Sequence, residues 1–411
     1  MERALDLAAL ADALGIHREL PTPDELQSLM ADAEVGLFLQ RTDLDERMLT
    51  SGWYLHGVAS VSGAAAVYGS ERQRRAFQIS AHLFELALTQ PRLVAGRLRL
   101  AFAAQVGYRR GGLDPNALAV YRQVEELVRA DIDLLDHMET LALEAGVTLL
   151  ALRPGLRRPL RAWVTQLGEL ARRLEVRDLR ATIFGPPADV VRGAEALLRF
   201  LVQGDQEALD VARALLRRPI FDDAARSDLD ARWVANHLLD LSDDFEAGSI
   251  WRALPPDVPP EPREALAVVE PAVLTLWPPQ RELIACHPSP LDPETKRVVV
   301  AVPTSAGKTL IAQLIVLAQL AAGGSVCYIV PTRSLGREVR RSLAARLRLM
   351  RRELAREEPD LAFSSFLDLD SRSVRAWRPP RPSTSSPSLR TPCAPARTLC
   401  LPTRHPMSLT S

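Results

Sequence analysis

Cysteine is scarce in this sequence, and its scarcity limits the kinds of protein that the chain can be. The first 285 residues contain none, and the four cysteines of the whole chain form no Cys-x-x-Cys pair. This argues against a disulfide framework or a structural zinc site and indicates a reducing compartment. No apolar run is long enough to span a membrane, and residues 1–15 predict an amphipathic helix rather than a signal peptide. These absences predict a cytoplasmic protein.

The chain also lacks an excess of either charge, because its 51 basic and 51 acidic residues cancel. Any contact with nucleic acid must therefore be made by a local basic patch rather than by the field of the whole molecule. Lysine is nearly absent, since Lys296 and Lys308 are the only lysines among the basic residues. The lysine at position 308 is informative, because a compact ammonium is what a phosphate-binding loop requires.

Helical periodicity dominates residues 1–252, which we predict to be an all-α accessory region of helical hairpins. Phe77, Ala81, Phe84 and Leu88, for example, recur at the spacing of one helical face. Breaks between helices are expected near Pro154-Gly155, at Gly185-Pro186-Pro187 and at Gly204-Asp205. No strict repeat period is present, so the sequence does not by itself predict a solenoid.

Two features of this region invite a functional interpretation. The segment from Glu125 to Glu144 is rich in acids and contains His137, which would suit a metal or acid–base site. A solvated helix face is the favoured interpretation. Trp53 and Tyr54, with His56 nearby, would suit stacking on a base, but packing in a core is again favoured.

The pattern changes after residue 252. Residues 253–263 carry five prolines and predict a semi-rigid linker. Residues 264–358 then alternate between β-branched strands and amphipathic helices, which predicts a parallel α/β sheet. The expected elements are a strand at Arg297–Val302, a helix from Thr309 to about Ala321, a strand at Ser325–Val330 and a helix from about Leu335 to Arg356.

The segment VPTSAGKT, residues 302–309, has the spacing of a phosphate-binding loop, although Val302 stands where the first glycine usually stands. Its position between a strand and a helix is the context that such a loop requires. We expect the backbone N–H groups to bind phosphates, Lys308 to reach the β- and γ-phosphates and the Thr309 hydroxyl to ligate Mg²⁺. The predicted ATP-binding residues here are Thr304, Ser305, Ala306, Gly307, Lys308 and Thr309.

The motif PTSAGKT, followed by Pro331-Thr332-Arg333-Ser334-Leu335, resembles the first RecA-like domain of superfamily 2 DEAD/DEAH-box helicases, and most closely the DExH branch. The resemblance covers residues 270–350. It implies that Pro331, Thr332 and Arg333 contact the backbone of one nucleic-acid strand, as hydroxyl, guanidinium and helix N-terminal amides suit phosphates. It also implies that Gln280, after Trp277-Pro278-Pro279, reads adenine. ATP, Mg²⁺ and a DNA or RNA partner follow from the same resemblance.

Several parts of such a motor are missing. No Asp-Glu-x-His, Ser-Ala-Thr or second RecA-like domain with an arginine finger follows residue 309. These parts polarise water and neutralise the transition state, so we expect ATP binding without useful hydrolysis by this chain alone. The expected fold is therefore a helical region, an incomplete P-loop domain and a tail.

Residues 359–411 are predicted to be a disordered tail. Residues 371–411 hold eight prolines, eight serines, seven arginines and no acid, and a frameshifted reading of GC-rich DNA is favoured over a native basic tail. Two further hypotheses stay open. One is a helical scaffold or signalling P-loop protein, with protein partners for the helical region, and the other is a product without activity.

Overall fold

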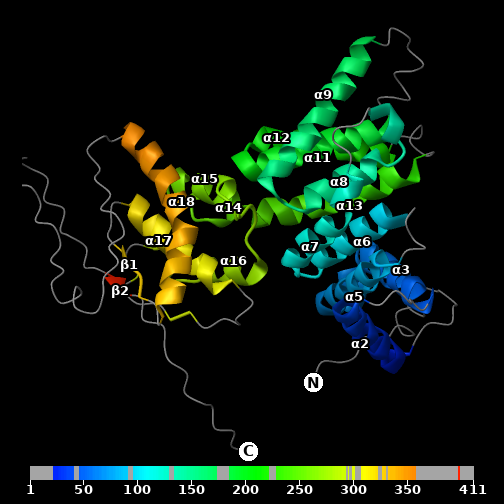
Figure 1. Cartoon of the computed structure of the whole chain (residues 1–411), viewed down its shortest axis with the longest axis horizontal. Coiled ribbons are helices and arrows are strands. Elements are labelled where there is room, and N and C mark those ends of the chain that lie inside the picture. Colours follow the sequence, from blue (N-terminus) through cyan, green and yellow to red (C-terminus); the bar gives the residue numbers. More distant parts are fainter. Residues whose placement is uncertain are drawn as a thin grey trace, which may run out of the picture. The chain divides into compact units, whose positions relative to one another are not determined.

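The chain forms two compact units, Met1–Ser249 and Ile250–Ser411, and each is described by itself. The structure is a computed structural model (Figure 1). It describes residues 22–40, 46–90, 96–128, 134–173, 185–221, 228–292, 295, 299–300, 307–322, 326–329, 332–357 and 397–398. No described helix is both long enough and apolar enough to cross a membrane.

Helices make up nearly all of the described part of the first unit, as the periodicity predicts. They are α2 (Pro23–Leu39), α3 (Glu46–Ser60), α4 (Ala64–Tyr68), α5 (Ser70–Leu88), α6 (Arg97–Arg110), α7 (Asp114–Val124), α8 (Leu141–Leu150), α9 (Arg157–Arg173), α11 (Pro186–Gln203), α12 (Gln206–Phe221) and α13 (Leu229–Gly248). Short 3₁₀ turns lie at Glu125–Leu127, Leu134–His137 and Pro154–Leu156.

Neighbouring helices in the sequence pack against each other in space. The pairs α5–α6 and α11–α12 are in extensive contact, while α8 packs on α6, α11 and α13 (Figure 1). The expected breaks are confirmed: a 3₁₀ turn begins at Pro154, α11 begins at Pro186, and Gly204 ends α11 in the left-handed conformation. Proline in a first helical turn costs no hydrogen bond, so helices can begin at proline. Glycine tolerates positive φ, so a helix can end at glycine.

An aromatic cluster lies where α3, α5, α6 and α13 meet. The Trp53 ring lies 4.5 Å from Phe84 and 5.9 Å from Trp233, and His56 is buried beside them. Core packing of this segment is therefore confirmed, although Trp53 keeps 37% of its surface exposed. Nearby, α8 approaches α6 so closely that a Cβ at Gly146 would lie 2.6 Å from Phe102 Cε2.

The interpretation of the acidic segment as a solvated face is wrong for one of its residues. Glu125, Glu126 and Glu139 are exposed, as expected. Glu144 is only 1% exposed and accepts hydrogen bonds from Thr140 Oγ1 at 2.7 Å and from His137 Nδ1 at 3.1 Å. Burying a carboxylate requires such partners, and they lie within two turns of the chain. No cluster of metal-binding side chains exists among the described residues.

The second unit contains α14 (Ile250–Ala253), α15 (Pro260–Val268), α16 (Pro278–Ala285), α17 (Lys308–Ala321) and α18 (Arg333–Glu357). Both helices expected in the nucleotide-binding region are present as α17 and α18. Within residues 253–263, prolines separate α14 from α15, but Pro260 and Pro262 lie in the first turn of α15, where a missing N–H is tolerated.

The two expected strands have a different outcome. Of Arg297–Val302, the described Val299 and Val300 have no regular structure, and the remaining residues lie outside the described ranges. Of Ser325–Val330, Val326–Cys327 form β1, which pairs in parallel with β2 (Arg397–Thr398). β2 is the only described part of the predicted tail. The described chain is thus mainly α-helical, and the parallel α/β sheet stays a prediction.

Candidate nucleotide and nucleic-acid site

The N-terminus of α17 is the centre of the candidate site. Gly307 precedes the helix with a φ of 76°, a left-handed conformation that favours glycine, and no described side chain caps the helix. Lys308 and Thr309 occupy its first two positions with exposed side chains. Uncapped amides at a helix N-terminus attract anions, so this end of α17 suits a phosphate. The predicted Thr304, Ser305 and Ala306 lie outside the described residues.

Gln280 lies directly against this helix start, although 27 residues separate it from Gly307 in the sequence. A Cβ at position 307 would be 2.2 Å from Gln280 Nε2, so the absence of a side chain at Gly307 makes this approach possible. The structure therefore brings the upstream glutamine beside Gly307, the described residue of the predicted loop that precedes α17.

The environment of Gln280 constrains how it can act. Its side chain is 2% exposed, and Oε1 accepts a hydrogen bond of 3.0 Å from the backbone N–H of Trp277. This bond satisfies one of the free amides in the first turn of α16. A base that uses the amide must share its carbonyl oxygen or displace that bond, so the adenine-reading role stays a prediction.

The described residues at the start of α17 fit Mg²⁺-ATP. Lys308 offers a positive charge beside the helix N-terminus, and the Thr309 hydroxyl offers one oxygen ligand to Mg²⁺. Mg²⁺ commonly takes few protein ligands and completes its octahedron with water and phosphate oxygens.

The segment expected to contact nucleic acid lies at the start of α18. Pro331 lies outside the described residues, and the side chain of Arg333 is likewise not described. Thr332 is exposed, and its Oγ1 accepts a hydrogen bond of 3.3 Å from the backbone N–H of Leu335. Thr332 thus caps α18, a structural role that sequence spacing alone does not reveal. A capping hydroxyl at a helix N-terminus remains beside amides that suit a phosphate.

A cluster of buried polar side chains joins α17 to α18, and our sequence analysis did not predict it. Arg346 is 2% exposed and donates to Gln313 Oε1 and, at 2.6 Å, to the Pro271 carbonyl oxygen. Gln313 Nε2 in turn donates to Ser342 Oγ at 2.9 Å. A detectable signal was the presence of Gln313 and Arg346 on helix faces that are otherwise apolar. These hydrogen bonds join α17 to α18.

Comparison with known proteins defines the class of this region. Residues 277–362 match the DEAD/DEAH box helicase family, so this segment is a DEAD/DEAH box helicase domain. The match includes Gln280, Lys308 and Thr332, which confirms the resemblance on which their roles rest.

Two distant homologues are curated proteins. Over 159 residues the chain is 28% identical to the Hachiman protein HamB of Bacillus cereus. This aligned segment covers 38% of this chain and 14% of HamB. Over 63 residues it is 43% identical to the ATP-dependent DNA helicase Hel308 of Methanocella arvoryzae, covering 15% of this chain and 8% of that helicase. This chain therefore spans a small part of each relative.

Proposed function

We propose that this chain is the ATP-binding N-terminal part of a superfamily 2 nucleic-acid helicase, with an accessory helical region before the motor domain. The observation that carries the proposal is the uncapped start of α17, where Lys308 and Thr309 follow a left-handed Gly307 against which Gln280 packs. The helicase domain at residues 277–362 supports it.

Each residue has a defined task in this proposal. The α17 amides and the Lys308 ammonium bind and orient the phosphates, while Thr309 holds Mg²⁺ through its hydroxyl. Gln280 holds the adenine end, and the segment Pro331–Arg333 binds the backbone of a DNA or RNA strand. Mg²⁺-ATP supplies the phosphoanhydride bond that a complete helicase motor cleaves.

Weak hydrolysis by these 411 residues is part of the same proposal. No Asp-Glu-x-His follows Thr309 in the sequence, and such carboxylates ligate the metal and orient the attacking water. We expect ATP to bind to this chain and to remain largely intact, which a phosphate-release assay on the purified chain measures directly.

A helical scaffold or signalling P-loop protein is the alternative function. The first unit favours it, because its helices form a large surface of the kind that binds proteins. This alternative requires nucleotide binding that does not respond to nucleic acid. A helicase instead couples the two ligands, so a single-stranded oligonucleotide must change the affinity for ATP, and ATP must change the affinity for the oligonucleotide by the same factor.

The two lysines of the chain allow a matched test of ATP binding. Lys308→Ala should weaken the binding of a fluorescent ATP analogue by at least about tenfold, because a charge-assisted contact with phosphate is worth roughly 1.5–3 kcal/mol. Lys296→Ala removes the only other lysine and should leave binding unchanged. Equal affinity of the wild-type chain and the Lys308→Ala variant would count decisively against the proposal.

A further inference from the structure

Helix α18 has two faces of opposite character beyond the segment at its start. One face packs against α15 and α17 and consists of Val339, Leu343, Arg346 and Met350. The opposite face is exposed and carries arginines at helical spacing. Arg337, Arg341 and Arg348 are separated by four and seven residues, so they lie in one row along the helix. Ala344 fills the remaining position of the row, and together these residues line a shallow hollow with Arg340.

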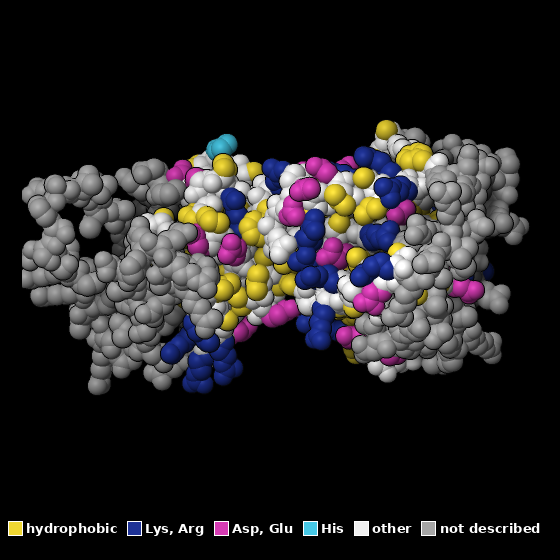
Figure 2. Space-filling view, turned by 90° about the horizontal axis from the view of Figure 1, so that it is seen from above, with side chains coloured by type: hydrophobic (Ala, Val, Ile, Leu, Met, Phe, Trp, Pro, Cys, Tyr) yellow, Lys and Arg dark blue, Asp and Glu magenta, His cyan; other side chains and the backbone are white. Residues whose placement is uncertain are grey.

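The charge of this row is not neutralised within the described chain. Between Arg333 and Met350 the helix has six arginines and one acid, Glu338. Arg337, Arg341 and Arg348 form no ion pair with any residue that the structure describes. Several arginines of the first unit, by contrast, form ion pairs, and Arg213, for example, bonds Glu246 at 2.8 Å. Figure 2 shows Lys and Arg side chains gathered toward the lower left of its view, in the second unit.

The length and position of the row suit an extended polyanion. From Arg337 to Arg348 the helix rises about 16 Å, enough to run beside several phosphates of one strand. The row begins one turn after Thr332, at the end of α18 where nucleic acid is expected to bind. A strand held at Thr332 can therefore continue along the exposed face of α18.

The chemistry of the row favours nucleic acid over an acidic protein. Protein interfaces depend on buried apolar or aromatic anchors, and the row contains no side chain larger than Ala344 apart from its arginines. Guanidinium groups bind phosphate oxygens in bidentate fashion and suit a backbone with regularly spaced charges.

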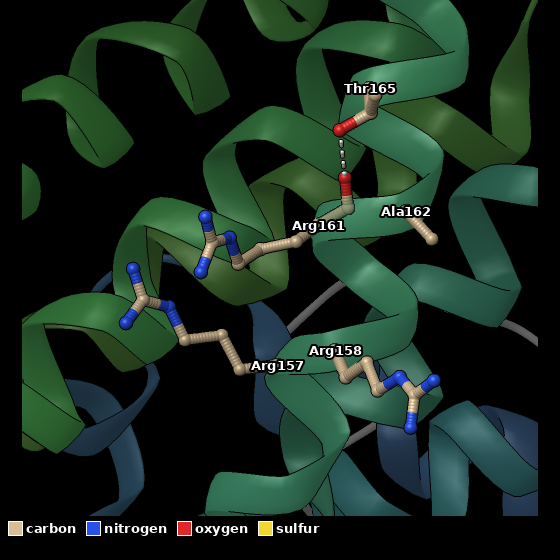
Figure 3. Close-up of a pocket in the computed structure, with 5 residues that line it drawn as sticks. All are labelled: Arg157, Arg158, Arg161, Ala162 and Thr165. Carbon is tan, nitrogen blue, oxygen red and sulfur yellow. Dashed lines mark hydrogen bonds between the residues drawn. The ribbon is translucent and has the colours of Figure 1, made fainter.

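A second group of arginines, on α9, provides a contrast. Arg157, Arg158 and Arg161 line a hollow of similar size with Ala162 and Thr165 (Figure 3). There, Arg157 Nε donates to Glu195 Oε1 at 3.0 Å, and Figure 3 shows Arg158 pointing away from Arg157 and Arg161. Glu169 is also exposed on the same helix. The α9 arginines diverge and are partly neutralised, so they do not form a continuous row.

We propose that Arg337, Arg341 and Arg348 form a phosphate-binding row on α18 that extends the nucleic-acid site from Thr332 along the helix. The inference rests on the proposed function, because that function places a strand of nucleic acid at Thr332. It adds to that function a set of backbone contacts on α18 that bind any base sequence, because the row offers only guanidinium groups.

The test compares two double variants of the full chain that lose the same charge. Binding of a fluorescein-labelled oligothymidylate is followed by anisotropy across a salt series. Arg337→Gln/Arg341→Gln should reduce the slope of log affinity against log salt by about 1 to 2, and the affinity at moderate salt on the order of tenfold. Arg158→Gln/Arg161→Gln on α9 should leave both quantities close to those of the wild-type chain. Both pairs are exposed, so circular dichroism and thermal unfolding should not change.

The outcomes separate this inference from the proposed function. Equal losses in the two double variants, an unchanged slope, or no oligonucleotide binding by the wild-type chain would each overturn the row on α18. If Lys308 supports ATP binding while the α18 variant binds oligonucleotide normally, the proposed function stands and the row is rejected. If ATP binding is absent but the α18 variant shows the expected loss, the row stands and the ATP-binding function is rejected.

Discussion

Two buried histidines give the first unit a dependence on pH that originates in single residues. His56 Nε2 on α3 and His237 Nε2 on α13 lie 3.2 Å apart, so one ring donates to the other. Burial lowers the pKa of His56 well below 6.5, and the neighbouring His237 lowers it further. Burial, followed by the charge of Arg110, lowers the pKa of His237 to about 4. Both rings are therefore neutral at pH 7.

Acid should destabilise the first unit through this pair. The unfolded chain takes up protons near pH 6.5 while the folded chain resists them, so the stabilisation is complete above about pH 6.5 and is lost as the pH falls toward 4. For His237 alone the loss is about 3 kcal/mol of unfolding free energy. We expect wild-type and His237→Asn chains to differ most near neutral pH and to converge near pH 4, as measured by denaturant unfolding.

An exposed histidine supplies the control for this prediction. His287 lies on the surface, so His287→Asn should alter the unfolding free energy by less than about 0.5 kcal/mol. A difference between the wild-type and His237→Asn chains that does not change with pH would contradict the assignment to the buried pair.

At the scale of secondary-structure elements, the packing of α17 on α18 depends on one buried arginine. Arg346 donates to Gln313 and to the carbonyl oxygen of Pro271, and burial lowers its pKa, although a guanidinium keeps its charge in proteins. Removal of the guanidinium leaves Gln313 Oε1 and the Pro271 carbonyl oxygen without this donor. We expect Arg346→Met to lower the stability of the second unit by about 2 kcal/mol or more, because unsatisfied buried groups are costly. Amide hydrogen exchange in α17 and α18 measures this loss.

Arg348 is the matched control, because it lies two residues further along the same helix on the exposed face. Arg348→Met should change the exchange rates little, since surface substitutions usually alter stability by less than about 0.5 kcal/mol. Similar effects of Arg346→Met and Arg348→Met would show that the buried hydrogen bonds contribute nothing.

Helices were predictable from the sequence, whereas buried polar pairs were not. The spacing of Phe77, Ala81, Phe84 and Leu88 is local information, and all four are buried on α5 as expected. The partners of Gln313 and Arg346 lie on other segments of the chain, so the periodicity of one helix does not predict them. At α7 a local signal is misleading as well: an aspartate before a proline, as in Asp114-Pro115, is typical of an N-cap, but Asp114 is the first residue of the helix. Its carboxylate pairs with Arg109 Nη1 at 2.8 Å, and Leu113 precedes the helix.

At the scale of the whole molecule, the two units have separate cores, so their responses to nucleotide should differ. Ligand that binds only the folded state stabilises it by about 2.7 kcal/mol at a hundred times its dissociation constant. We expect Mg²⁺-ATP to slow amide exchange in α16 and at the start of α17 while leaving α5, α6 and α11 unchanged. Equal protection in both units would argue against a nucleotide site confined to the second one.

The candidate site was predictable to a similar degree as the fold. The motif identified Lys308 and Thr309 from sequence alone, and the described part of the chain presents both at a helix start. The strands around the loop were predicted from β-branched residues, but of their span only Val326–Cys327 is a strand among the described residues. Strand pairing joins segments that are distant in the sequence, so a local sequence pattern predicts strand pairing less reliably than it predicts a helix.

The aromatic cluster of the first unit has a consequence for the order in which the protein is made. His56 and His237, which meet there, are 181 residues apart in the chain. When α3, α5 and α6 have left the ribosome, α13 has not yet been synthesised, so Trp53 and Phe102 lack their contacts with Trp233. Nascent chains that stall before α13 therefore expose an apolar surface of the kind that chaperones bind.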